Sequence, residues 1–262
     1  MTELLYIGGY GRSGSTLLES LLATRPDVLA CGEVVCCLRK RVERRCTCGK
    51  PRQKCDVWRA FYPTPGPLRG WTHVELTLAL LDQAAPRYAL MVDSSKTAWG
   101  ALTAPFRLRR KLGRAFHLVH VLRDPRGVCW STVSGAWSRR AVLRSRTLRY
   151  VRTALGWLAA NLSCEVFRWL YPEQYRRVRY EDLNSSHQEV LTGLFQDLSL
   201  PEVEAAKTAG DNRHQLYGNQ SRYRHFEPAA IQEDVRWQSK MPAAERNFVS
   251  VLTWPLRLRY GY

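Results

Sequence analysis

The sequence of 262 residues predicts an α/β fold in which helices flank both faces of a central parallel sheet. Two observations predict it. Short apolar runs alternate with longer segments of helical spacing, and several of these runs end in glycines or in a polar cluster. Continuous apolar runs are typical of parallel strands buried on both faces, and strands that alternate with helices imply βαβ units. The chain shows no internal repeat or convincing linker, so we expect one domain over residues 1–262.

The first half of the chain supplies two of the predicted strands. Residues 4–8 form a short apolar run that ends in glycines, and residues 16–23 then read as a helix. The stretch 31–70 is rich in Cys, Arg, Pro and Gly, and we expect an irregular excursion there. Residues 73–83 have helical spacing. Residues 88–93 (YALMVD) are again continuously apolar and predict a buried strand.

The second half continues the alternation. Residues 116–122 and 175–180 predict two further strands. Helical spacing is found over 127–137, over 148–170, and from about 186 to 198. The tail that begins at Asn212 is polar and aromatic with few periodic signals. We expect it to wrap over a ligand site rather than to add to the sheet.

The composition indicates a globular and strongly basic protein. Hydrophobic residues make up 45% of the chain and charged residues 24%, which excludes a disordered chain. No apolar run reaches the roughly 18 residues that a membrane-spanning helix needs. The start lacks the features of a secretory signal, so we expect a cytoplasmic protein. The net charge of +17 favours anionic partners.

One basic stretch stands out in the middle of the chain. It suits either a charged, solvated face or a lid or landing site for an acidic acceptor or carrier protein. Its members are Arg139, Arg140, Arg144, Arg146, Arg149 and Arg152.

A glycine-rich loop between the first predicted strand and helix is the first motif that carries chemistry. It reads Gly9-Tyr-Gly-Arg12-Ser-Gly14-Ser15-Thr. Such a turn points successive backbone N–H groups at one place, where the helix dipole adds partial positive charge, so it predicts an anion cradle. A nucleotide-triphosphatase loop would carry lysine where this chain has Ser15. The cation here is Arg12, inside the loop.

A second motif, Arg123-Asp124-Pro-Arg126 followed by Ser131, comes after the strand at 116–122. Open α/β sheets bind their ligands at the carboxyl ends of strands, which is where Arg123 falls. A guanidinium and a hydroxyl converging there would suit a second phosphate. The alternative is that Arg123 or Arg126 pairs with Asp124 and caps the following helix.

Together, the two motifs resemble those of the PAPS-dependent sulfotransferase family, especially its bacterial members that act on carbohydrates and small molecules. Three further matches extend the resemblance over nearly the whole chain: Asp93-Ser-Ser-Lys96, Tyr180-Glu-Asp and Gly218-Asn-x-x-Arg222. The resemblance implies a P-loop-like fold. It also implies transfer of a sulfuryl group from 3'-phosphoadenosine-5'-phosphosulfate (PAPS) to a hydroxyl of a small molecule. The products would be a sulfate ester and adenosine 3',5'-bisphosphate (PAP), and no metal would be required.

The resemblance further implies which residues hold the nucleotide. The 5'-phosphosulfate would lie on Arg12, Ser13, Gly14, Ser15 and Thr16. The 3'-phosphate would be bound by Arg123 and Ser131. Near the adenosine we expect Tyr180, with Gly218, Asn219 and Arg222 closing over the nucleotide.

The predicted catalytic residues are Arg12, Lys96 and Glu33. Arg12 would stabilise charge on the leaving phosphate oxygen, and Lys96 would neutralise the sulfuryl oxygens. Cytosolic phenol and steroid sulfotransferases carry a base histidine where this chain has Ala98. Glu33 resembles the position of a glutamate base in bacterial carbohydrate sulfotransferases, so we expect it to accept the acceptor proton. Asp93 is the second choice, although it could instead orient Lys96.

Histidines and cysteines complete the candidates. His117 and His120 lie within an apolar strand and are expected to be core residues rather than bases. His214 suits a nucleotide contact or a helix end. Cys46, Cys48 and Cys55 are compact enough to hold zinc, but two Cys-x-x-Cys pairs or Cys with His are the usual pattern and neither is present. The sequence therefore favours packed free thiols over a disulfide or a metal, and no metal site is predicted.

Two other classes of protein are alternatives to a sulfotransferase. A P-loop nucleotide kinase is disfavoured because the loop lysine is missing. A basic nucleic-acid-binding module would need arginines interleaved with exposed aromatic residues, and we expect no nucleic-acid partner. The acceptor remains open among a sugar, a phenol, an antibiotic scaffold and a lipid, and the sequence leaves open whether the chain forms a homodimer.

Overall fold

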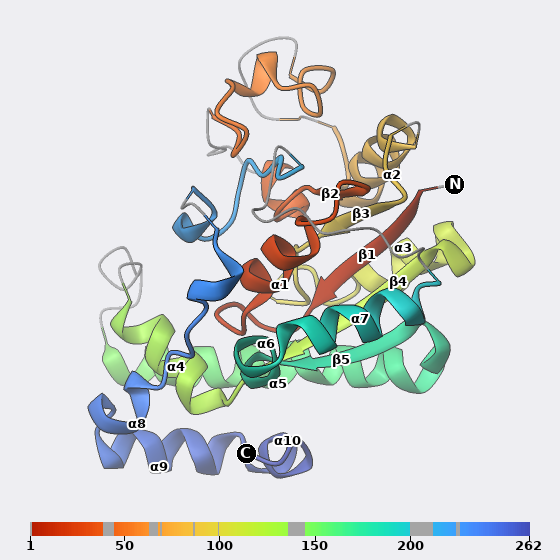
Figure 1. The fold of residues 1–262 in the computed structure, drawn as a ribbon. Coiled ribbons are helices and arrows are strands. Elements are labelled where there is room, and N and C mark those ends of the chain that lie inside the picture. Colours follow the sequence, from red (N-terminus) through yellow and green to blue (C-terminus); the bar gives the residue numbers. More distant parts are fainter. Residues whose placement is uncertain are drawn as a thin grey trace.

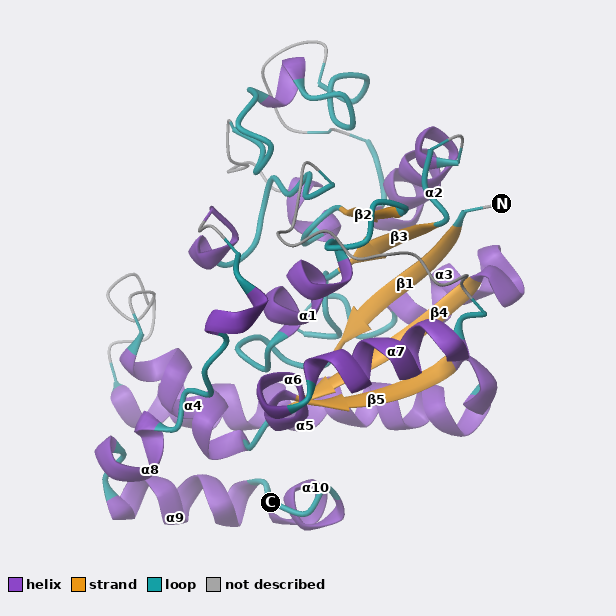
Figure 2. Cartoon of the chain, in the orientation of Figure 1, coloured by secondary structure: helices purple, strands orange, loops and turns teal. Residues whose placement is uncertain are grey.

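The computed structural model describes residues 2–38, 45–62, 68, 70–85, 87–98, 100–135, 145–199, 212–223 and 226–262. At its centre is a five-stranded sheet in which every pair of neighbouring strands is parallel. The strands lie in the order β2-β3-β1-β4-β5 (Figures 1 and 2). Their bounds are β1 Glu3–Gly8, β2 Val28–Ala30, β3 Leu90–Asp93, β4 Phe116–Leu122 and β5 Tyr175–Arg179. This arrangement confirms the predicted α/β fold.

Side chains alternate across β1 and separate two hydrophobic clusters. Leu5 and Ile7 belong to the cluster on one face, while Leu4 and Tyr6 belong to the cluster on the other. Successive side chains of a strand point to opposite faces, so a strand covered on both sides is apolar throughout. This burial on both faces explains why β1 and β4 read as continuous apolar runs.

Helices cover both faces of the sheet (Figure 2). On the face of Leu5 and Ile7 lie α1 Ser15–Leu22 and α7 His187–Asp197. The opposite face is covered by α2 His73–Ala84, α3 Ala104–Leu112 and the long α5 Arg146–Leu170. The capping box between Thr72 and Glu75 fixes the start of α2, since each side chain accepts the other residue's backbone N–H.

Most predicted elements are present, with shifted ends. The strand predicted at 88–93 is shortened to β3, and the helix predicted from residue 127 begins two residues earlier as α4 Pro125–Ser134. Asp124 causes this earlier start, because its side chain accepts the N–H of Arg126 and caps the helix. The described part of the excursion contains the short 3-10 helices η1 Val34–Leu38 and η2 Arg52–Lys54 and an isolated antiparallel bridge between Arg45 and Pro51.

The tail after Asn212 differs from the sequence-based expectation. Its end is helical, in α8 Arg236–Lys240, α9 Ala243–Leu252 and α10 Trp254–Arg259. Its beginning does touch the sheet, because Arg213 forms an isolated parallel bridge to Ala30 at the end of β2. We call residues 212–223 the strap. Over the described residues, no helix is both long and apolar enough to cross a membrane.

Candidate active site

The glycine-rich loop joins β1 to α1 and is held in a conformation that glycine permits. Gly9 and Gly14 both have positive φ, at 103° and 100°. A Cβ on Gly9 would lie 2.4 Å from the carbonyl oxygen of Val121, and one on Gly14 would lie 2.7 Å from the ring of Tyr180. The loop thus lies tightly between β4 and the start of α6 Tyr180–Ser185. Within the part of the chain that the structure describes, no side chain caps α1, so its first N–H groups are available to an anion.

Arg123 lies where β4 ends and reaches across to this loop. Its Nη1 donates to the carbonyl oxygen of Arg12 at 3.1 Å, and its Nη2 donates to the carbonyl oxygen of Asp234 at 2.7 Å. The guanidinium also lies 4.2 Å from the centre of the Tyr180 ring. The helix-capping alternative is therefore wrong for Arg123. It is Arg126 that pairs with Asp124.

The side chain of Arg12 reaches in the other direction, from the glycine-rich loop to α4. Its Nε donates to Oγ of Ser131 on α4 at 3.2 Å, although 119 residues separate the two. Burial and the nearby Arg123 lower the pKa of Arg12 below its ordinary value. Two partly buried guanidinium groups therefore lie close together at the carboxyl edge of the sheet. Concentrated positive charge of this kind suits a ligand that carries several negative charges.

The loop fits a phosphate group by a further observation. The hydroxyl of Ser13 is buried and has no hydrogen-bond partner among the described residues. A buried polar atom without a partner costs about 1–3 kcal/mol, so such atoms usually mark a ligand or water position. With the open start of α1, this hydroxyl makes residues 9–15 suitable for holding an anionic phosphate.

Glu33 and Lys96 meet at the same edge, between β2, β3 and β1. Glu33 follows β2, Lys96 follows β3, and the Lys96 ammonium donates to Oε1 of Glu33. Lys96 has φ of 66°, and its N–H donates to the carbonyl oxygen of Ile7 on β1 at 3.1 Å. The hydroxyl of Tyr6 donates to the carbonyl oxygen of Lys96. These contacts hold the positive-φ backbone that directs the lysine toward Glu33.

Asp93 does not orient Lys96, which corrects the alternative drawn from the sequence. The carboxylate is fully buried and is bound by other groups. Its Oδ2 lies 2.8 Å from Nε2 of His73 on α2, and its Oδ1 accepts the N–H of Ser95 at 2.9 Å. Asp93 therefore ties α2 to the end of β3. Helical spacing is the one feature of His73 that is visible in the sequence.

Tyr180 lies beside the glycine-rich loop. Its ring contacts Gly14 and Arg123, and its hydroxyl accepts the N–H of Asp234 at 3.1 Å. Trp237, three residues further, approaches Gly127 at the start of α4. The tail thus does cover this edge of the sheet, through residues 234–237.

The strap residues expected to close over a nucleotide lie close to one another. Arg222 is buried and donates from Nη1 to the carbonyl oxygens of Gly218 and Asn219, at 2.7 and 3.0 Å. These three residues therefore stabilise the turn of the strap. The short helix η6 Gln220–Tyr223 packs against α1 (Figure 1).

The strand histidines behave as the sequence predicts. His120 is fully buried between the hydroxyl of Tyr175 at 2.7 Å and Oδ1 of Asn161 at 2.6 Å. Burial lowers the pKa of His120 to about 4. His117 contacts Glu3 at 2.9 Å, and burial lowers its pKa as well. Both side chains are therefore bound by neighbouring groups of the fold, and their lowered pKa values favour the neutral forms.

Glu19 is a buried carboxyl that sequence reasoning missed. It lies on α1 and accepts the N–H of Gly32 at 2.6 Å and the hydroxyl of Ser94 at 2.7 Å. Burial raises the pKa of Glu19 to about 7. Its two contacts join α1 to the segments that carry Glu33 and Lys96. An acid within an amphipathic helix gives no signal of such a role.

The basic stretch falls partly outside the described residues, which exclude Arg139, Arg140 and Arg144. Within α5, Arg146 pairs with Glu245 of α9 at 2.6 Å. That pairing favours a structural role for Arg146 rather than a landing site.

The comparisons with known proteins agree with this geometry. A model of the sulfotransferase family matches residues 5–204. No curated protein sequence matches the chain.

Several solved structures share the fold. The sulfotransferase domain from the curacin biosynthetic pathway is 18% identical with a TM-score of 0.61, covering 95% of this chain and 96% of that chain. The sulfotransferase domain of the Synechococcus PCC 7002 olefin synthase is 21% identical with a TM-score of 0.63, covering 100% and 95%. Mouse sulfotransferase SULT7A1, solved in complex with PAP, is 10% identical with a TM-score of 0.55, covering 99% and 84%.

The fold and the family match therefore define a sulfate-transferring enzyme with a P-loop-like sheet. This chain belongs to the sulfotransferase family.

Proposed function

We propose that the protein transfers a sulfuryl group from PAPS to a hydroxyl of a small-molecule acceptor, giving a sulfate ester and PAP. The observation that carries the proposal is the contact between the two sequence motifs. Arg12 of the glycine-rich loop donates to Ser131, and Arg123 donates back to the loop at Arg12. Two anion-binding groups from distant parts of the chain thus share one edge of the sheet. A nucleotide with phosphates at both its 5' and 3' positions suits such a pair.

Each part of the site would bind a different part of the donor. The glycine-rich loop, with the unpaired hydroxyl of Ser13 and the uncapped start of α1, would hold the 5'-phosphosulfate. Arg123 and Ser131 would bind the 3'-phosphate, and the Tyr180 ring would lie against the adenosine. The solved mouse relative with PAP supports this class of nucleotide. Binding requires Arg12 and Arg123 to exchange some of their present contacts for phosphate oxygens.

In the proposed chemical step, Glu33, Arg12 and Lys96 have separate roles. Glu33 would take the proton of the acceptor hydroxyl while that oxygen bonds to sulfur. The bond from sulfur to the 5'-phosphate oxygen breaks, and Arg12 would stabilise the charge that grows there. Lys96, beside Glu33, would neutralise the sulfuryl oxygens. Sulfuryl transfer resembles phosphoryl transfer in its loose in-line geometry, so positioning and charge supply most of the catalysis.

Incubation with sulfur-labelled PAPS and a panel of phenols, sugars, lipids and antibiotic scaffolds tests the proposal. We expect a labelled ester and one PAP per ester formed, with rates unchanged by a magnesium chelator. Turnover of ATP that requires magnesium, with none of PAPS, would instead indicate the kinase alternative. Cytoplasmic location and any homodimer remain predictions that cell fractionation and light scattering would test.

A further inference from the structure

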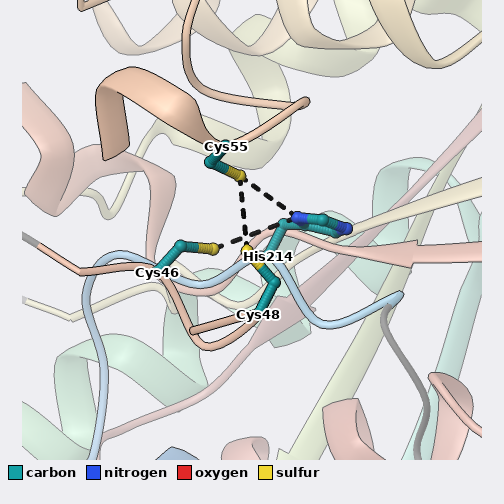
Figure 3. Close-up of side chains that lie close together, drawn as sticks. All are labelled: Cys46, Cys48, Cys55 and His214. Carbon is teal, nitrogen blue, oxygen red and sulfur yellow. Dashed lines mark hydrogen bonds between the residues drawn. The ribbon is translucent and has the colours of Figure 1, made fainter. Parts of the chain in front are cut away.

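Four side chains from two distant parts of the chain converge beside the strap. Cys46, Cys48 and Cys55 come from the excursion, and His214 comes from the strap (Figure 3). Their ligand atoms all lie within 4.8 Å of one another. The local cysteine pattern lacks a histidine. His214 supplies one, although 159 residues separate it from Cys55.

The distances match those of a tetrahedral zinc site. Two thiolates at the usual zinc–sulfur distance of about 2.3 Å lie about 3.8 Å apart at the tetrahedral angle. Sγ of Cys48 lies 3.8 Å from Sγ of Cys55. Nδ1 of His214 lies 3.2 Å from Sγ of Cys55 and 4.0 Å from Sγ of Cys46. The side chains in Figure 3 all point toward one central position.

The surroundings are those of a closed structural site. Cys46, Cys55 and His214 are buried, and Cys48 is half-buried. Backbone hydrogen bonds fix the turns that carry the cysteines, because the N–H of Cys46 donates to the carbonyl oxygen of Lys50 at 2.9 Å and the N–H of Trp58 donates to that of Cys55 at 3.1 Å. Groups that hold ligand side chains in place in this way preorganise a metal site. Three thiolates with one imidazole in tetrahedral array select zinc among the common metals.

We propose that Cys46, Cys48, Cys55 and His214 bind one structural Zn²⁺ ion. All four ligands come from the chain, so the ion has no open position for catalysis. Binding releases the thiol protons, and no oxidant or reductant is involved.

The ion fastens the excursion to the strap at the edge of the sheet. Three hydrogen bonds already join Thr47 to strap residues 213 and 215. Nε1 of Trp58 donates to the carbonyl oxygen of His214 at 2.6 Å, and the N–H of His214 donates to Ala30 at the end of β2. The N–H of Glu33 donates to the carbonyl oxygen of Tyr217, further along the strap. The zinc site therefore also supports the backbone position of Glu33.

Metal analysis of the full chain, purified under reducing conditions from zinc-supplemented cells, tests the proposal without any sulfotransferase assay. We expect about one zinc per chain. Replacement of the zinc by Co²⁺ should give the visible bands of a tetrahedral ion with thiolate ligands. Cys48→Ser and His214→Ala should lose the zinc on dialysis against a weak chelator. Cys129→Ser should retain it, since Cys129 is a buried cysteine of α4 outside the cluster.

Hydrogen exchange adds a structural readout. Removal of zinc should expose the amides of residues 45–58 and 212–223 while β1 and β4 stay protected. A zinc-free wild type whose Co²⁺ form lacks thiolate bands would overturn the proposal, even if the variants fail to fold. One iron per chain in place of zinc would overturn the proposal in favour of an iron site. Two free thiols fewer than the eight cysteines, counted in the denatured chain without reductant, would overturn it in favour of a disulfide.

Discussion

The Glu33 carboxylate and the Lys96 ammonium form an ion pair at the carboxyl edge of the sheet, with side chains only 18% and 11% exposed. The two residues follow neighbouring strands, β2 and β3. A proton acceptor and a cation therefore occupy one place beside the glycine-rich loop. In the proposed reaction, Glu33 would accept the proton of the attacking hydroxyl and Lys96 would neutralise charge on the sulfuryl group.

Glu33→Gln should lower turnover by roughly 100-fold or more, because the amide keeps the contact with Lys96 but cannot accept a proton. The affinity for PAP should stay within about threefold of the wild type. Steady-state rates with an acceptor from the panel, together with calorimetry of PAP, measure both. Glu245→Gln is the control, since it changes a carboxylate paired with Arg146 on α9. Near-normal turnover of Glu33→Gln would assign the base elsewhere.

Arg12→Ala should depress turnover more than it weakens binding, because its charge partner grows in the transition state. Loss of such a group costs about 100- to 1,000-fold in rate. Single-turnover measurement separates the chemical step from release of PAP. Ser131→Ala provides a comparison, since it removes the 3.2 Å contact while keeping the guanidinium. A change confined to KM in Arg12→Ala would show that Arg12 only binds.

Gly14→Ala tests the close approach of the loop to Tyr180. The new Cβ would lie 2.7 Å from the ring, in addition to the strain of a φ of 100°. Gly100→Ala is a matched control, because Gly100 has φ of 90° and, apart from its chain neighbours, none of the described residues has an atom within 4 Å of the added carbon. Each variant should lose about 1–3 kcal/mol of unfolding free energy from strain. Only Gly14→Ala should also lower the affinity of the protein for PAP. Equal PAP affinity of both variants would remove Tyr180 from the nucleotide site.

Glu19→Gln tests the buried carboxyl on α1 through the pH dependence of stability. The folded pKa of Glu19 is raised from 4.5 to about 7 by burial. The folded chain thus holds a proton that the unfolded chain releases between these values. The stability that this proton contributes is fully present below pH 4.5 and is lost as pH rises through 7.

Relative to the Gln variant, the wild type should therefore lose about 1.4 kcal/mol of unfolding free energy per pH unit between about pH 5 and 7. Urea unfolding of both chains over this range measures the difference. The low pKa of His120 also makes stability depend on pH, but by the same amount in both chains, so it cancels in the difference of their unfolding free energies. A difference that does not change with pH would mean that Glu19 is ionised in the folded chain.

Strands β1, β3 and β4 were predictable from sequence because they are buried on both faces and leave continuous apolar runs, whereas β5 (YRRVR) buries only Tyr175 and Val178. β2 was missed because Val28–Ala30 is too short to leave a pattern. The terminal helices α9 and α10 were missed, and they bury little, since α10 buries none of its residues and α9 only Val249.

Local motifs place Arg12, Arg123 and Lys96 at the carboxyl edge of the sheet, where the structure has them, and their roles stay predictions. Partners joined only by the fold were not predictable from the sequence. The pairing of Asp93 with His73 depends on how α2 packs against β3, and the meeting of His214 with three cysteines depends on the path of the strap. Neither leaves a trace in the spacing of neighbouring residues.

The most direct test of the proposed nucleotide site compares PAP with AMP, which lacks the 3'-phosphate, on the wild type and on Arg123→Ala. Calorimetry without magnesium measures both affinities. The wild type should bind PAP far more tightly than AMP. A charge-assisted contact of about 1.5–3 kcal/mol predicts that Arg123→Ala weakens PAP by about 10- to 150-fold and leaves AMP almost unchanged. Arg126→Ala, whose guanidinium pairs with Asp124, should change neither strongly. Equal weakening of both nucleotides by Arg123→Ala would contradict the account, since Arg123 would then only hold the loop at Arg12 and the tail at Asp234.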